Sequence, residues 1–156
     1  MKEETALREQ LVRSLDWDSA HIRFEQAVEE FPRELRGRRA GPHSAWELLE
    51  HLRITLWDIV EFTRDAKSHV SPEFPSGYWP ASSAPPDDAA WEASIEQYRD
   101  DLKKLAGIAA DPSIDLYAKI EGGDGQTVLR EILLSLDHNA YHLGQFMIVR
   151  KTLTGA

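Results

Sequence analysis

Long segments with apolar residues at helical spacing constrain the fold of this chain more than any other feature. Between Ser44 and Lys67 apolar side chains recur every three or four residues, and the same spacing holds over residues 87–106 and 126–152. That period places them on one face of a helix. Residues 114–120 could form a short extended piece, but no partner strand is apparent. We therefore predict an all-α fold.

The N-terminal part has a shorter and interrupted helical pattern. Apolar spacing predicts helices over residues 3–15 and 19–31, with Asp16 and Asp18 as a stop and a new N-cap, and with Pro32 ending the second helix.

A capping box and two long connections predict where one of the later helices starts and how these helices are joined. Ser44 and Glu47 have the spacing of a capping box, which predicts a helix start at this point. Residues 69–87 and 107–125 are long connections, the first rich in Pro, Ser and Gly. We expect one domain over residues 1–156, a four-helix bundle whose topology differs from simple up-down-up-down.

Charge and composition narrow the class of partner. The chain has 27 acidic and 18 basic residues and a net charge of −9, which argues against nucleic acids and anionic membranes as partners. No apolar run approaches the length of a membrane span, and the charged N-terminus predicts no signal peptide, so a cytoplasmic location is expected. Because there is no cysteine, any metal site must use nitrogen and oxygen ligands.

His138 and His142 are the most suggestive functional residues. Four residues apart on a helix, they lie one above the other and can present two nitrogens to one metal ion. They fall on a narrower face beside the predicted main apolar stripe, which consists of Leu129, Ile132, Leu133, Leu136, Ala140, Leu143 and Met147. His51, mid-helix beside Leu48 and Thr55, is the best candidate for a third ligand. The alternative is a half-exposed patch that binds no metal.

The remaining candidates have weaker signals. His43 could act near the helix entrance, as a cap-region or substrate group, whereas His21 and His69 are expected at the surface. Glu47 and Asp137 could orient the candidate ligands, or could be plain solvated carboxylates. Two further groups could contribute to a site or be structural: the aromatic residues Phe74, Tyr78 and Trp79, and the basic residues Arg33, Arg36, Arg38 and Arg39.

Several segments, taken together, resemble the DinB/YfiT-like superfamily. They are Trp46–Arg53, Gly125–Glu131 and Asp137–Gln145, together with Trp79-Pro80. The resemblance implies an up-down-down-up four-helix bundle with long crossover loops, commonly a homodimer. It also implies a three-histidine site for a divalent metal ion, and by motif the ligands are His51, His138 and His142. Zinc and nickel are the expected ions, with iron, cobalt and manganese as alternatives.

The resemblance leaves the reaction open, because fold and ligands are shared among members with different activities. Similar proteins include S-transferases that use low-molecular-weight thiols, a mycothiol-dependent maleylpyruvate isomerase, and proteins assigned as hydrolases. We expect a metal-dependent thiol S-transferase acting on a small-molecule substrate. The alternatives are a metal-dependent hydrolase, a non-enzymatic stress-related metal-binding protein, and an interaction module with incidental histidines. No catalytic residue is assigned.

Overall fold

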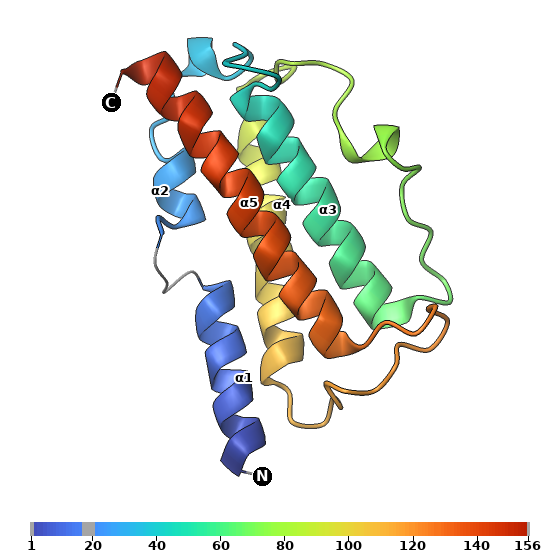
Figure 1. The fold of residues 1–156 in the computed structure, drawn as a ribbon. Coiled ribbons are helices and arrows are strands. Elements are labelled where there is room, and N and C mark those ends of the chain that lie inside the picture. Colours follow the sequence, from blue (N-terminus) through green and yellow to red (C-terminus); the bar gives the residue numbers. More distant parts are fainter. Residues whose placement is uncertain (1, 17–20, 156) are drawn as a thin grey trace.

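The protein is a bundle of four long helices that run roughly along one axis (Figure 1). The computed structural model describes residues 2–16 and 21–155. The helices are α1 (Lys2–Leu15), α2 (Phe24–Val28), α3 (Ala45–Asp65), α4 (Asp88–Ala110) and α5 (Val128–Thr154), with 3-10 turns η1 (Arg33–Leu35) and η2 (Ser76–Tyr78). Within these described ranges there is no strand, and Lys119 forms an isolated bridge with Thr127. The predicted all-α bundle is confirmed.

The helices run up, down, down and up. In Figure 1, α1 and α5 ascend while α3 and α4 descend, so α3 and α4 are parallel neighbours. Parallel neighbours require a connection that returns along the full helix length, and residues 66–87 provide it on the outside of α3. This is the up-down-down-up arrangement with a long crossover.

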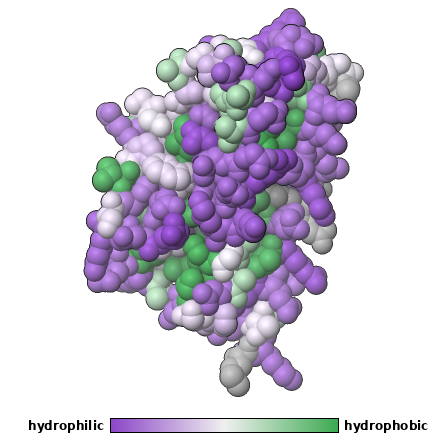
Figure 2. All heavy atoms as spheres, turned by 180° about the vertical axis from the view of Figure 1, so that it is seen from behind, coloured by the Kyte–Doolittle hydropathy of each residue, from purple (hydrophilic) through white to green (hydrophobic). Residues whose placement is uncertain are grey.

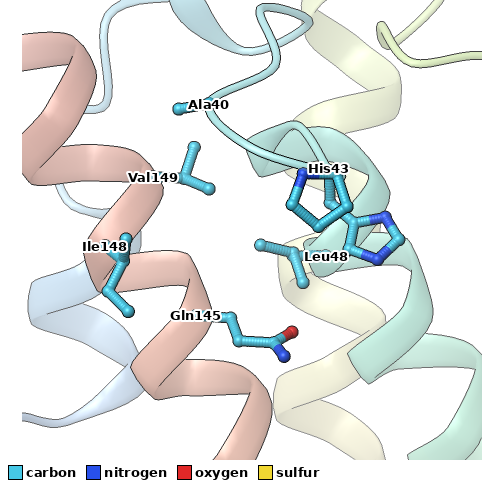
Figure 3. A pocket seen from close by; sticks show the side chains of 7 residues that line it. Ala40, His43, Leu48, Gln145, Ile148 and Val149 are labelled. Carbon is cyan, nitrogen blue, oxygen red and sulfur yellow. The ribbon is translucent and has the colours of Figure 1, made fainter.

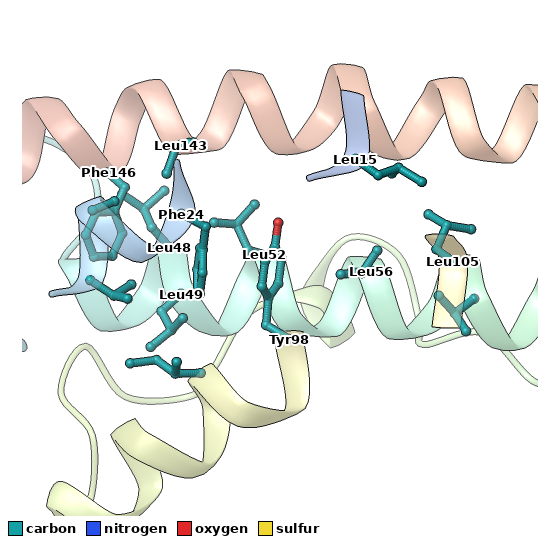
Figure 4. Close-up of a cluster of buried hydrophobic side chains, with 14 of the residues drawn as sticks. Leu15, Phe24, Leu48, Leu49, Leu52, Leu56, Tyr98, Leu105, Leu143 and Phe146 are labelled. Carbon is teal, nitrogen blue, oxygen red and sulfur yellow. The ribbon is translucent and has the colours of Figure 1, made fainter. Parts of the chain in front are cut away.

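The core lies between the helices and draws on all of them. Phe24 of α2 stacks on Tyr98 of α4 with ring centroids 4.1 Å apart, and α3 contributes a row of buried leucines (Figure 4). The largest fully buried side chains are Leu15, Leu48, Leu49, Leu52, Leu56, Val60, Trp91, Tyr98, Leu105, Leu116, Ile132 and Phe146. The face opposite that of Figure 1 is mostly hydrophilic, with hydrophobic side chains visible in small groups (Figure 2). None of the helices in the described ranges is long and apolar enough to cross a bilayer.

The second N-terminal helix is shorter than the predicted 19–31. It spans Phe24–Val28, and the N-cap expected at Asp18 lies outside the described residues. Arg150 of α5 donates to the carbonyl oxygens of Ala27 and Glu29, at 2.8 and 2.7 Å. Arg150 therefore donates to carbonyl groups that would accept backbone N–H groups if α2 continued.

The buried face of α5 extends beyond the predicted apolar stripe. Of the stripe residues, Ile132 and Leu143 lie in the core, and Leu129, Leu136, Ala140 and Met147 pack against it. Leu133 is 50% exposed, whereas Ser135, Asn139 and His142 are buried. Asn139 donates to Ser135 Oγ at 3.2 Å, so this polar face enters the bundle with hydrogen-bond partners. The helix therefore turns His142 toward α3 and leaves Tyr141 and Ile148 on its outer side, 64% and 65% exposed.

Arg8 attaches α1 to the end of α4. Its buried guanidinium donates to the carbonyl oxygens of Ala109, Asp111 and Ile114, at 3.1, 2.8 and 2.6 Å. These carbonyls lie at and beyond the C-terminus of α4, where the helix itself supplies no donors.

Replacing Arg8 with Met is expected to lower the free energy of unfolding by about 2–3 kcal/mol, because three carbonyl groups lose a charged donor. Urea unfolding followed by circular dichroism measures the change. Arg13→Met, an exposed position on the same helix, is the matched control and should differ little from wild type. Equal stability of the two variants would contradict this role of Arg8.

Candidate metal centre

The start of α3 is defined by the capping box predicted from the sequence. Ser44 Oγ accepts from the Glu47 backbone N–H at 3.1 Å, and Glu47 Oε2 accepts from the Ser44 N–H at 2.8 Å. Glu47 also forms an ion pair with Arg39. Its carboxylate therefore holds the helix start in place, and the suggestion that it orients His51 is not supported by these contacts.

Three histidines converge between α3 and α5. The Nε2 atom of His51 lies 3.2 Å from Nε2 of His142 and 3.2 Å from Nε2 of His138. One ligand atom from each ring lies within 4.8 Å of the other two. A tetrahedral ion about 2.0–2.1 Å from each nitrogen would hold the nitrogens roughly 3.3–3.4 Å apart. The three residues predicted from the sequence are thus brought together at a spacing that could hold a metal ion.

Each ring has a polar partner at its other nitrogen. His51 Nδ1 lies 2.8 Å from the Tyr78 carbonyl oxygen, and His142 Nδ1 lies 3.0 Å from Gln145 Oε1. Both oxygens can only accept, so each Nδ1 carries the proton and each Nε2 presents its lone pair. His138 Nδ1 is 3.4 Å from Thr55 Oγ1. Such outer partners fix ring orientation and tautomer in metal sites.

The electrostatic environment favours neutral imidazoles. Burial lowers the pKa of His51 and of His138 to about 4, and the neighbouring rings act in the same direction. Burial also lowers the pKa of His142. At neutral pH the three side chains are therefore in the uncharged form that binds metal.

Trp79 of the crossover covers one side of the triad. Its indole stacks on the His51 ring, with ring centroids 3.9 Å apart and an interplanar angle of 3°. It also stacks on the His43 ring, with centroids 4.3 Å apart and an angle of 11°. His43 and Gln145 line a cavity of about 160 Å³ beside the site (Figure 3). His43 therefore stacks on the indole that covers His51 and forms part of the wall of this cavity, whereas the helix N-cap is Ser44.

His69 is not the surface residue that the sequence suggested. Its side chain is 8% exposed, and its Nε2 lies 2.6 Å from Asp58 Oδ1. Tyr78 donates its hydroxyl to Asp58 Oδ2 at 2.7 Å. Two residues of the crossover thus bind one carboxylate of α3, which holds the Tyr78 carbonyl at His51. His21 is exposed as expected, and so is Asp137.

The arginines of residues 33–39 are largely engaged within the protein. Arg36 is buried, and its Cζ atom lies 4.5 Å from the centroid of the Trp91 ring. Its Nη1 atom forms an ion pair with Asp88 Oδ1 at 3.0 Å. Arg33 pairs with the same carboxylate, and Arg39 pairs with Glu47. Three of the four therefore have structural roles.

A second cavity, of about 240 Å³, borders the triad directly. His51, His138 and Thr55 form its polar side, and Tyr78 and Trp79 of the crossover form part of its wall. Small molecules could therefore approach the Nε2 cluster from this side.

In the metal-free protein, the stability contributed by His51 and His138 should be lost as the pH falls from about 6.5 to about 4, with no further loss from these two groups below that range. An unfolded histidine takes up a proton near pH 6.5 but a folded His51 or His138 only near 4, so the unfolded state binds more protons in this window. Urea midpoints measured across the window test this. His51→Gln combined with His138→Gln should flatten the dependence, and His21→Gln should not. An unchanged slope in the double variant would contradict it.

Comparisons with known proteins give one match. A family model described as the DinB superfamily matches residues 16–146. Neither the curated proteins nor the solved structures contain a match. The matched range includes all three converging histidines and most of the bundle. The chain belongs to the DinB superfamily.

Proposed function

We propose that this protein is a metal-dependent enzyme, and that it transfers the sulfur of a low-molecular-weight thiol to a small-molecule acceptor. The observation that carries the proposal is the convergence of three Nε2 atoms, each on a ring whose Nδ1 has its own oxygen partner. A divalent ion held there would lower the pKa of a thiol or water that binds it.

The composition of the cluster supports an open site. In the part of the chain that the structure describes, the group contains these three histidines and no fourth His, Asp or Glu. Structural zinc sites usually have four protein ligands, whereas catalytic ones have three and leave a position for substrate. This favours an enzyme over a protein that holds metal for stability alone.

The ligand chemistry also bears on the metal. Three imidazoles suit zinc and nickel, and also iron and cobalt, whereas manganese prefers oxygen ligands. We propose zinc or nickel as the bound ion. The side chains position the reactants: Trp79 shields His51 from one side, and the adjoining cavity admits the acceptor.

Thiol transfer needs little else from the protein. The thiol releases its proton to solvent water, its sulfur forms a bond to an electrophilic carbon of the acceptor, and the group displaced from that carbon leaves with the electron pair of the broken bond. Asp58 in the cavity already accepts from Tyr78 and His69, and burial beside Asp58 raises the pKa of Tyr78 to about 12. Both side chains are thus engaged in hydrogen bonds, and thiol transfer requires neither of them as a base.

Hydrolysis is the second candidate, and Asp58 is the observation that favours it. A carboxylate in the wall of the same cavity as His51 and His138 could orient an attacking water, despite its two hydrogen bonds.

Metal content is the first test. After loading with Zn²⁺ or Ni²⁺ and dialysis, we expect one ion per chain in the wild-type protein and most of it lost in His142→Ala. His21→Ala, an exposed histidine outside the cluster, should retain the ion. Elemental analysis provides the measurement, and equal metal in His142→Ala and wild type would refute the site.

The reaction is then tested with the loaded protein. Bacillithiol, mycothiol and glutathione are each supplied with an electrophile, in parallel with ester and amide substrates. We expect thiol consumption that requires the metal and is absent in His142→Ala. Metal-dependent ester or amide cleavage without thiol consumption would instead establish the hydrolase.

A further inference from the structure

We propose that the cavity bounded by His51 and His138 binds a compact, uncharged, apolar group of the acceptor substrate, and that Asp58 in its wall excludes anionic groups. The inference rests on the proposed function, because it treats this cavity as the approach to the metal. It adds the chemical class of the substrate.

The position of the cavity identifies it as the substrate side. His51 and His138, two of the three converging histidines, line it, whereas the cavity beside His43 and Gln145 is lined by none of them. When one group of a molecule reaches the Nε2 cluster through the cavity of about 240 Å³, the remaining part of that molecule contacts the walls of this cavity.

Those walls are mainly apolar. Ile59 comes from α3, Leu134 from α5, and Trp79 with Phe74 from the crossover. Phe74 is 84% exposed, with its ring 6.2 Å from that of Tyr78, so an aromatic side chain stands at the rim. Enclosure by apolar side chains from three elements favours an apolar guest, since binding removes both surfaces from water.

The size of the cavity limits the guest. An apolar cavity of about 150 Å³ can hold benzene. At about 240 Å³ this one can hold a single ring with a few additional atoms, or a branched aliphatic group of similar size.

Charge sets the second limit. Asp58 is partly buried and faces the same space, and the residues lining the cavity include neither Lys nor Arg. An anionic group would be desolvated beside a carboxylate without a cationic partner, which is unfavourable. A thiol that carries carboxylates therefore does not fit here, and the cavity belongs to the acceptor.

The test uses the Co²⁺-loaded protein and three hydroxamic acids that ligate the ion through the same group. Acetohydroxamic acid carries a methyl group, benzohydroxamic acid a phenyl ring, and 4-carboxybenzohydroxamic acid a charged ring. Binding is followed by the visible absorption of Co²⁺ at pH 8 and corrected for each compound's affinity for the free ion. We expect the phenyl compound to bind about tenfold more tightly than the methyl compound, and the carboxylate to remove that advantage.

Variants assign the effect to the cavity. Leu134→Ser should reduce the phenyl advantage without weakening acetohydroxamic acid. Ile148→Ser, on the same helix beside the other cavity, is the matched control and should change neither. Asp58→Asn should restore binding of the charged ring. Equal affinities for phenyl and methyl, or a phenyl advantage unaffected by Leu134→Ser, would overturn the proposal.

A metal-free measurement separates failure of this inference from failure of the proposed function. Saturation-transfer NMR of benzyl alcohol with the apo protein reports the cavity alone, and the signal should fall in Leu134→Ser but not in Ile148→Ser. If Co²⁺ does not bind, the proposed function fails, and the NMR result still decides whether the cavity takes an apolar ring. If Co²⁺ binds and Leu134→Ser has no effect in either experiment, only the substrate class is wrong.

Discussion

The contact between α3 and α5 through three imidazole rings is the constraint on which the site depends. His51 supplies one nitrogen from α3, and His138 and His142 supply two from successive turns of α5. Because burial keeps these rings uncharged, the repulsion that protonated rings would exert at this spacing is avoided, and the two helices can pack closely around them. The same proximity would allow one metal ion to bind all three rings, so the packing of the two helices sets the geometry of the candidate metal site.

The topology explains why the crossover takes part in the site. Because α3 and α4 are parallel, residues 66–87 must return along α3 and pass His51 on the way. The chain uses this passage: Tyr78 gives a carbonyl oxygen to His51, and Trp79 stacks on its ring. Asp58 holds the segment by accepting from His69 and Tyr78. A connection that the topology requires thus also orients one histidine of the cluster and encloses a cavity.

Local rules predicted what depends on local sequence. The Ser44 cap, the bundle and the three converging histidines followed from residue spacing and from family resemblance. The full extent of the buried face of α5 did not, because apolar periodicity does not predict that a polar face with Ser135 and Asn139 is buried when these two side chains pair with each other. His69 was misjudged for a related reason. Its partner Asp58 lies eleven residues earlier, on a helix reached by a reversal of the chain. The carbonyl of Tyr78 was not predictable at all, since any residue could supply it.

The three histidines and the residues that line the adjoining cavity are different parts of the site, and we expect the cavity residues to select the substrate. The bundle and the three histidines can be common to proteins with different reactions. The walls around them include side chains outside the Nε2 cluster, such as Leu134, Phe74 and Ile59. Substitutions there alter shape and charge while leaving the Nε2 cluster intact. The reaction a member carries out is therefore to be sought in the crossover and in the α3 and α5 residues that face it, rather than in the ligands.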